Sequence, residues 1–584
     1  MAGRTIRQST RSSRGDVRAL LGELSSLVRQ FDANSARRKK AIVESLVRTA
    51  IVRPADLIAY HDLLCFLVAY PDNKGVLALA EAELRGMSAR LAHYRTTTRD
   101  RHARKLENSG LVYTTTTHPY SYELTQRLLR DHAVRIDIDR DAAEKAIEQT
   151  LPEFLGALVS WQESDALDYD EERSTSEWLE MARRSKAGGY LKTIVDLIDR
   201  APIGHLVKRH FFDRLELETV WRLERSRASR TLQRVPCGRV FYQTGPFARR
   251  SEDLPGTLRA PAAALELQSP KRGEGLVRVI NEVLAVRNRE LFPLTLANPG
   301  EVYRYRAGRG LTIFIFGMRA EDRLPIEANF GAMLVRNNLP IGYGVAAVLF
   351  DRVEIAINVF PAFRAGESAF TIEQFFRLFY HHFGSRVFLV RNTQMGYGED
   401  EALYSGAFWF YYKLGFRALD AGVRALAERE VARQRADKAY RTPIGTMRRL
   451  SKSDVVLSVD GISAAEWKEV SIINLGYAVT KYFAGRYDGD RQRGLADTVE
   501  RVRRALGIRS LSRWSSDEIT ALERMAPLVA MIPDLHRWSA TERSDLAGIV
   551  RAKGGACERR FVQRCNRHGR FREAVGRLAS RSPD

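Results

Sequence analysis

Residues 357–370, INVFPAFRAGESAF, set the fold class of this chain, because a strand pattern passes into a helix pattern within one short turn. The strand pattern ends at Val359, and Pro361 then removes a backbone donor from any ladder. A helix pattern begins at Ser368, and a second strand pattern, RVFLVRNTQ, follows at 386–394. This order predicts a β-α-β crossover, and the proline predicts that its two strands diverge at their C-terminal ends.

Further strand patterns lead into this turn. They are the β-branched and aromatic runs GLTIFIFGM (310–318), FGAMLVRN (330–337), IGYGVAAVLF (341–350) and RVEIAINVF (352–360). The turn residues 337–340 and the short break at Asp351–Arg352 predict antiparallel hairpins between neighbouring runs. A second helix is predicted from DEALYSGAFWFYYKLGF, after the last strand. The central region is therefore predicted to be a mixed α/β unit.

Helical patterns fill both flanks of this unit. Apolar residues recur at spacings of three and four over 15–235, and again from 421 onward, apart from a strand-like run at 454–461. We therefore expect a multidomain α+β chain, with a central mixed sheet between N-terminal and C-terminal α-helical regions. The expected boundaries are 1–235 for the first helical region, 236–289 for an irregular connector plus one helix, 290–420 for the sheet domain and 421–584 for the basic C-terminal helical region.

The composition is that of a globular protein. The chain has 584 residues, enough for three or four domains of about 150 residues each. Its 45% hydrophobic and 28% charged residues exclude disorder over most of the length. Its longest apolar runs fall short of the about 18 residues that a membrane helix needs, and no hydrophobic signal core follows the basic N-terminus. We expect a cytoplasmic protein that spans no membrane.

The cysteines indicate neither a disulfide scaffold nor a metal site. Four are present, and they are too few and too scattered for a disulfide framework. Cys557, Cys565 and His568 lie close together in the sequence, but their spacing is not that of a zinc module. No metal is therefore expected.

The net charge of +22 is concentrated in the flanks. Residues 1–240 contribute +7, residues 241–420 only +3, and residues 421–584 as much as +12. Basic ends can attract nucleic acid or an acidic partner by releasing counterions. The alternative is that these are solvated, arginine-rich helices, and neither end shows the interleaved aromatic and basic residues that stack single-stranded bases.

Two segments carry candidate chemistry. In the turn, the unpaired first amides of the helix, the positive end of its dipole and Arg364 predict an anion site that suits a phosphate. In SGAFWFYYKLGFR (405–417), most side chains suit a core helix that stops at Gly415. The phenols Tyr411 and Tyr412 are unusual in so apolar a run, and one hydroxyl is expected to seek a partner or a cavity.

Together these segments carry a resemblance to a known family. The order strand, V-x-P-x-x-R-x-G turn, helix, strand and a helix ending Y-x-K-L-G-F-R is similar to that of the GNAT acetyltransferase superfamily, over residues 290–420. The resemblance implies a GNAT-like sheet domain with acetyl-CoA, or another acyl-CoA, as cofactor. The phrases NLPIGYG, NVFPAFRAGES and SGAFWFYYKLGF also resemble those of a larger set of bacterial proteins of unknown role, which implies a shared architecture but no substrate.

The resemblance also implies site residues. Arg364 and Ala369 match the ends of the family's pyrophosphate turn, whereas Glu367 stands in place of its middle glycine and Gly366 comes one position early. Tyr411 matches the tyrosine that, in many members, reprotonates the departing thiolate as general acid. The implied cofactor-binding residues are Arg364, Ala365, Gly366, Glu367, Ser368 and Ala369 in the turn, with Asn358 and Val359 for the pantetheine arm.

The general base is chosen on physical grounds. Glu354 lies on the strand that leads into the turn, where partial burial would suit a carboxylate that accepts a proton from an amine. The alternative is an ordinary strand carboxylate that pairs with Arg352 or faces solvent. Glu373 is expected at the surface of the crossover helix, and His381 and His382 at its end, where positive charge suits the dipole.

These observations favour an acyl-CoA-dependent N-acyltransferase. An unknown amine would attack the acyl group directly in a ternary complex, since no cysteine lies in 290–420 to form a covalent intermediate. The alternative from another class is a catalytically degenerate GNAT-fold scaffold that binds protein or nucleic acid through its basic helical flanks. A third possibility is a relative that transfers an aminoacyl or fatty acyl group. The sequence does not predict an oligomeric state.

Overall fold

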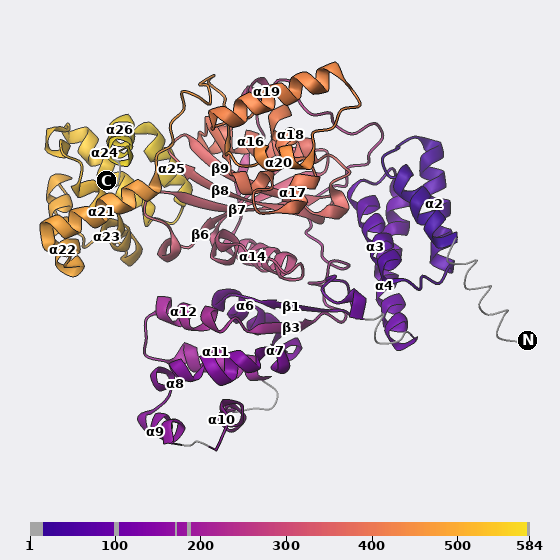
Figure 1. Ribbon diagram of the computed structural model, residues 1–584, viewed down its shortest axis with the longest axis horizontal. Coiled ribbons are helices and arrows are strands. Elements are labelled where there is room, and N and C mark those ends of the chain that lie inside the picture. The colour runs from indigo at the N-terminus through magenta and orange to yellow at the C-terminus, as the bar shows by residue number, and fades with distance from the viewer. Residues whose placement is uncertain (1–15, 98–103, 170–171, 184–188, 581–584) are drawn as a thin grey trace, which may run out of the picture.

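The computed structural model describes residues 16–97, 104–169, 172–183 and 189–580, so the basic residues 1–15 lie outside the described part. A large mixed sheet occupies the centre, and helices cover both of its faces (Figure 1). The N-terminal helices lie at one end of this sheet, the C-terminal helices at the other, and a smaller unit below it. The chain is therefore a mixed α/β protein with a central sheet flanked by helices, as the sequence predicts at this level.

The central sheet has nine strands in the order β11-β12-β10-β9-β8-β7-β6-β5-β4. Its members from β4 to β9 pair antiparallel in sequence order, β9 and β10 pair parallel, and β12 pairs antiparallel with both β10 and β11. The strands are β4 (Leu265–Leu267), β5 (Ala297–Gly308), β6 (Leu311–Met318), β7 (Ala328–Arg336), β8 (Leu339–Leu349), β9 (Arg352–Val359), β10 (Val387–Val390), β11 (Arg417–Ala418) and β12 (Val455–Ser458).

Turn chemistry fixes the register of this sheet. Asn337 and Asn338 both have positive φ, 44° and 68°, which is the two-residue hairpin geometry that asparagine tolerates, and they join β7 to β8. Phe350, with φ 53°, and Asp351 join β8 to β9. Both predicted hairpins are confirmed, but the second closes at Phe350–Asp351, one residue before the predicted break at Asp351–Arg352.

Helices on both faces of the sheet complete the central region. Helix α16 (Ser368–Phe383) is confirmed where the sequence predicts it, and Gly384 ends it with φ 73°. The prediction of a single helix after the last strand of the crossover is wrong. Gly406, with φ 71°, divides that segment into α17 (Asp400–Tyr404) and α18 (Ala407–Lys413). The remaining helices here are α13 (Leu254–Arg259), α14 (Pro270–Ala285), α15 (Phe292–Thr295), α19 (Ala421–Ala436) and α20 (Ile444–Leu450).

The N-terminal region is not helical throughout. Helices α2 (Ala33–Arg48), α3 (Pro54–Ala69) and α4 (Lys74–Thr97) share one apolar core with the central sheet. A second core follows, around a three-stranded sheet in the order β1-β3-β2, built from β1 (Thr115–Pro119), β2 (Ile136–Ile138) and β3 (Glu218–Arg222). Its helices are α6 (Tyr122–His132), α7 (Arg140–Lys145), α8 (Pro152–Leu158), α9 (Trp161–Tyr169), α10 (Thr175–Ala182), α11 (Gly189–Arg200) and α12 (His205–Leu215).

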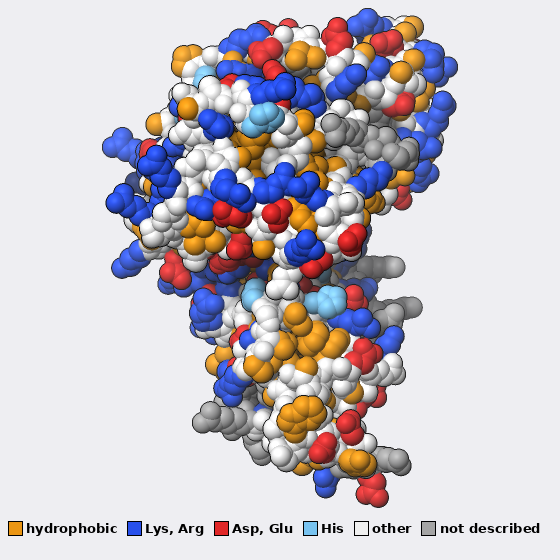
Figure 2. Space-filling view, turned by 90° about the vertical axis from the view of Figure 1, so that its left-hand side faces the viewer, with side chains coloured by type: hydrophobic (Ala, Val, Ile, Leu, Met, Phe, Trp, Pro, Cys, Tyr) orange, Lys and Arg blue, Asp and Glu red, His pale blue; other side chains and the backbone are white. Residues whose placement is uncertain are grey.

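The C-terminal region is a bundle of helices that shares the core of the central sheet. The helices are α21 (Ile472–Tyr487), α22 (Arg491–Ala505), α23 (Ser516–Ala530), α24 (Ala540–Lys553), α25 (Glu558–Arg567) and α26 (Gly569–Ala579). Figure 2 shows lysine and arginine side chains spread over this end of the molecule. Within the described residues, no helix combines the length and the apolar composition that crossing a bilayer requires.

Candidate functional site

The two strands of the crossover pair over only part of β9. β9 and β10 pair only at Arg352–Val387, Val353–Phe388 and Glu354–Leu389, after which β9 continues to Val359 without β10 beside it. The predicted strand 386–394 is too long, because β10 ends at Val390 and Asn392–Met395 forms a 3-10 helix, so the register shows where pairing ends and leaves the predicted divergence a prediction. The backbone edge of β9 beyond Glu354 is therefore unpaired on the β10 side.

Arg364 lies beside the end of β9 that β10 leaves unpaired. Its Nε donates to the carbonyl oxygen of Val359 at 3.0 Å, and its Nη2 donates to Oδ1 of Asn358 at 3.3 Å. Its Nη1 is 2.5 Å from a carboxylate oxygen of Glu401 at the start of α17, and both side chains are substantially exposed. The hydrogen bond and charge of Arg364 lower the pKa of Glu401. Arg364 thus joins the end of β9 to α17, with its guanidinium accessible to solvent.

The N-terminus of α16 is uncapped. Its N-cap position is Glu367, whose side chain makes no capping hydrogen bond. Within the described part of the chain, the amides of Ser368 and Ala369 therefore have no side-chain acceptor, and both residues are only partly buried. Free amides at the positive end of a 16-residue helix, next to Arg364, can bind an anion.

The Glu367 carboxylate is directed into the protein. It is fully buried and pairs with Arg336 of β7 and with Arg309, which lies in the turn between β5 and β6, each at 2.5 Å. It also accepts a hydrogen bond from the Ala248 amide at 2.7 Å. Burial acts to raise the pKa of Glu367, but the hydrogen bonds and charges of the two arginines lower it overall. The negative charge of Glu367 is thus neutralised away from the helix end.

Helix α3 supports the turn from behind. The hydroxyl of Tyr70, the residue after α3, accepts a hydrogen bond from the Glu367 amide at 3.1 Å. A Cβ atom on Gly366 would lie 2.4 Å from atoms of the Tyr70 ring, so only glycine permits this approach. The ring also lies 4.3 Å from the guanidinium of Arg336. Sequence reasoning missed Tyr70, because no local pattern links residues 297 positions apart.

Tyr411 packs in the aromatic core under α16. Its ring lies edge-on to Phe416 at 5.5 Å, and Phe416 contacts Phe376 of α16 at 5.6 Å. Tyr411 is only 4% exposed, and burial raises its pKa, so the hydroxyl keeps its proton at neutral pH. Tyr412 is less buried and stacks under the guanidinium of Arg417 at 4.2 Å.

Glu354 is the last residue of β9 that pairs with β10, and its carboxylate is ion-paired. Its carboxylate is 2.7 Å from Arg391 and 3.4 Å from Arg352, the partner that the alternative interpretation names. Both arginines also pair with Glu469, which makes a network of shared charges. Such a network is as typical of a structural cluster as of a catalytic base.

The other acid and the histidines of the crossover helix have structural contacts. The expectation that Glu373 lies at the surface is wrong, since the side chain is buried. The connector covers it, and its carboxylate accepts a hydrogen bond from the Ser251 amide at 2.7 Å. His381 and His382 each reach a backbone carbonyl of the connector, on Ala260 and Ala263, at 2.8 Å. These contacts hold the connector against α16.

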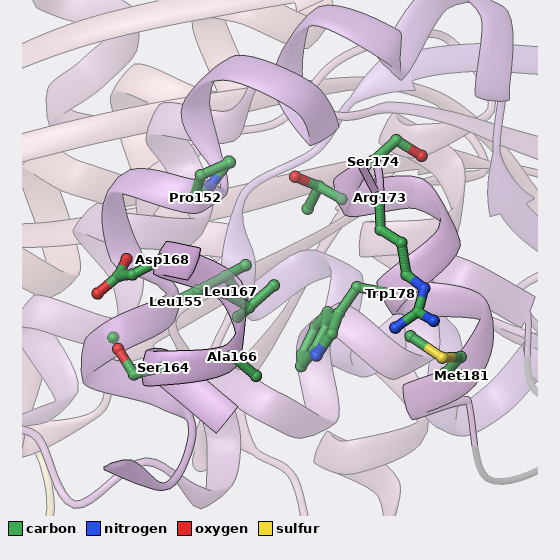
Figure 3. Close-up of a pocket in the computed structure, with 12 residues that line it drawn as sticks. Pro152, Leu155, Ser164, Ala166, Leu167, Asp168, Arg173, Ser174, Trp178 and Met181 are labelled. Atoms are coloured by element: carbon green, nitrogen blue, oxygen red, sulfur yellow. The ribbon is translucent and has the colours of Figure 1, made fainter. Parts of the chain in front are cut away.

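A cavity of about 180 Å³ lies in the smaller N-terminal unit (Figure 3). Trp178 and Leu167 face it from α10 and α9, with Met181 and Arg173 at its border. Because these residues belong to the separate core around β1–β3, the cavity is not part of the turn after β9. Within the described residues, no group of three or more His, Cys, Asp or Glu side chains could hold a metal ion.

Comparison with protein-family models, with curated proteins and with solved structures finds no match for this chain.

Proposed function

We propose that the turn between β9 and α16 binds the pyrophosphate of an acyl-CoA, and that the protein transfers the acyl group to an amine. The observation that carries this proposal is the uncapped N-terminus of α16 beside the end of β9 that β10 leaves unpaired, with Arg364 at the same place. Three sources of positive potential meet there: free amides, the helix dipole and a guanidinium. The Glu367 side chain points into the protein, which supports the proposal, because its carboxylate then does not compete for an anion at the N-terminus of α16.

The chemistry proposed is direct transfer. The open edge of β9 near Asn358 and Val359 offers backbone groups to the amide-containing pantetheine arm. The amine nitrogen attacks the thioester carbonyl, a C–N bond forms and the C–S bond breaks. Tyr411 is the proposed donor of a proton to the departing thiolate. Glu354, the last residue of β9 that pairs with β10, is the proposed acceptor of the proton that the amine loses. Positioning of the two reactants supplies most of the acceleration.

Thermal unfolding in the presence of acetyl-CoA tests the binding step. A ligand at one hundred times its dissociation constant stabilises the folded state by about 2.7 kcal/mol, so a clear rise in Tm is expected. Arg364→Gln should reduce the rise, and Arg448→Gln, at an exposed arginine paired with Asp400, is the matched control. The absence of any rise at millimolar acetyl-CoA would contradict the proposal.

A second candidate function is polyanion binding by the C-terminal bundle. Arg560, Arg564 and Arg567 lie on one face of α25 and border a cavity of about 420 Å³. Within the described part of the chain, none of the three has a carboxylate within ion-pair distance, whereas many other arginines are paired. Three unpaired guanidiniums on one helix face suit successive phosphates of a nucleic acid. Binding of a fluorescent oligonucleotide at low salt tests this candidate.

A further inference from the structure

A cysteine, a histidine and a carboxylate meet on α3, outside the site described above. The ring of His61 donates from Nδ1 to Oδ1 of Asp62 at 2.9 Å, and its Nε2 lies 3.7 Å from Sγ of Cys65. Asp62 in turn accepts a hydrogen bond from Arg230 at 2.7 Å. Because positions 61 and 65 are one helical turn apart, α3 places thiol and imidazole on the same face. Because Sγ of Cys65 also lies 4.0 Å from Nδ1, the thiol is within reach of both ring nitrogens, and Asp62 holds the ring beside it.

A small cavity adjoins this cluster. It is bordered by Cys65 and His61, by Arg230 and Arg287, and by Phe360 at the end of β9. Its volume of about 10 Å³ is near the least that can hold one water molecule. Cys65 and His61 are 4% and 1% exposed, so only a reactant about the size of water can reach the sulfur.

The surroundings of the cavity are electropositive. Arg287 lies 4.1 Å from the centre of the Phe360 ring and donates to Gln233 and to the Val283 carbonyl. Within the described residues, Arg287 has no carboxylate within ion-pair distance, and Asp62 is the one acid that borders the cavity. A negative charge on Cys65 would balance this excess.

The protonation equilibria agree with that geometry. Burial acts to raise the pKa of the Cys65 thiol, but the charge and the hydrogen bond of His61 outweigh it, and the net shift is downward. Burial acts to lower the pKa of His61, but Cys65 and Asp62 raise it overall. Both shifts favour a thiolate beside an imidazolium.

We propose that Cys65 is a peroxide-reactive thiolate, oxidised to a sulfenic acid by hydrogen peroxide that enters the cavity beside His61. The sulfur donates an electron pair to one peroxide oxygen, so an S–O bond forms and the O–O bond breaks. The sulfur is oxidised by two electrons, and the second peroxide oxygen is reduced. The hydroxide that leaves takes the proton of the His61 imidazolium and becomes water. This inference is independent of acyl-CoA binding.

The other cysteines provide internal controls. Burial raises the pKa of Cys237 to about 11, and burial also raises the pKa of Cys565, despite the charge of Lys553. Cys565 is as buried as Cys65, each being 4% exposed, yet it has no imidazole beside it among its described contacts. A difference in reactivity between these two thiols therefore reports the His61 cluster rather than burial.

The experiment exposes the full-length protein to a small excess of hydrogen peroxide at pH 7, removes the peroxide with catalase, unfolds the protein in the presence of dimedone to trap sulfenic acid, and quantifies each cysteine by peptide mass spectrometry. Cys65 should be labelled at least about tenfold faster than Cys565 and Cys237, since the thiolate is the reactive form. Cys65→Ser should abolish this fast labelling. His61→Gln should slow it at least about tenfold while Cys237 stays unchanged.

If His61→Gln does not fold, the pH profile of the wild-type protein replaces it. The rate of Cys65 oxidation by hydrogen peroxide, measured by the same trapping at each pH, should stay near its plateau at pH values where a free cysteine peptide has already lost most of its reactivity. Labelling of Cys65 no faster than Cys565, or a peptide-like pH profile, would overturn the proposal.

Discussion

At the scale of single residues, Glu401 is expected to compete with the cofactor for Arg364. The two side chains form an exposed ion pair at 2.5 Å, and such pairs contribute up to about 1 kcal/mol. Glu401→Gln should therefore strengthen acetyl-CoA binding by up to about fivefold, because the guanidinium becomes free for the pyrophosphate. Isothermal titration calorimetry measures the change, and unchanged or weaker binding would show that Arg364 does not contact the ligand.

Tyr411 gives a second prediction at this scale. If its hydroxyl protonates the departing thiolate, Tyr411→Phe should lower kcat about a hundredfold or more with little change in KM, since general acid catalysis has about that magnitude. Stability should change little, because the ring and its contacts with Phe416 remain. Tyr412→Phe, on the same helix, is the matched control. A wild-type kcat in Tyr411→Phe, on a confirmed amine substrate, would exclude this acid.

At the scale of elements, the packing of α3 on the turn predicts an unusual sensitivity at Gly366. A methyl group there would lie within 2.4 Å of the Tyr70 ring, so Gly366→Ala should destabilise the protein by about 1–3 kcal/mol. Gly476→Ala, in α21 with open space around the position, should be neutral or stabilising. Denaturant unfolding measures both, and Tyr70→Leu should partly rescue Gly366→Ala. Equal stabilities would show that α3 can move away without cost.

Sequence patterns predict those elements whose own residues determine them. α16 is found to the residue because Ser368 and Gly384 bound an uninterrupted apolar pattern, and the hairpin at Asn337–Asn338 follows from turn chemistry. β5 was missed because Pro299 and Gly300 interrupt its pattern, where the register with β6 shifts. β11 has only two residues and exists through its pairing with β12, which no local pattern encodes.

Some features of the candidate site could likewise be predicted from local sequence, and others could not. Arg364 and the free amides of α16 follow from the local sequence of the turn, so they could be predicted. The inward direction of Glu367 could not, because Arg309, in the turn between β5 and β6, and Arg336 of β7, which hold it, are distant in the sequence. The His61–Cys65 pair is visible as a helical spacing, but its cavity depends on Arg287 and Phe360, far along the chain.

At the scale of the whole molecule, buried charges hold the C-terminal bundle on the sheet. Glu301 of β5 accepts hydrogen bonds from the amides of Glu558 and Arg559, at 2.8 and 3.0 Å, and lies 3.3 Å from Arg323. Lys553 pairs with Glu558 in the same cluster, and these side chains are at most 3% exposed. Burial, opposed by the charge of Arg323 and the two amides, raises the pKa of Glu301 to about 7.

This cluster predicts a pH dependence of stability. Between about pH 4.5 and 7, the folded state holds a proton on Glu301 that the unfolded chain releases, so stability should fall as pH rises through this window, by at most about 3 kcal/mol. Glu301→Gln removes the titrating group, so its unfolding free energy should decline less between pH 5 and 7.5. Parallel declines in the two proteins would assign the pH dependence to other groups.

The basic charge of the C-terminal region belongs to a folded surface rather than to a tail. Phe561, Val562 and Phe571 of α25 and α26 are buried in the common core, so deletion of 551–584 would unfold the bundle. Polyanion binding is therefore tested by substitution, with Arg560, Arg564 and Arg567 all changed to Gln.

If each of these three arginines contacts one phosphate of duplex DNA, the magnitude of the slope of log K against log salt should fall by up to about 3, with weaker binding at every salt concentration. Arg503 and Arg504 changed to Gln are the control, since both already pair with Glu500. Equal slopes in the triple variant and the wild type would show that α25 does not bind the phosphates, and the cavity beside it would then have no role in nucleic-acid binding.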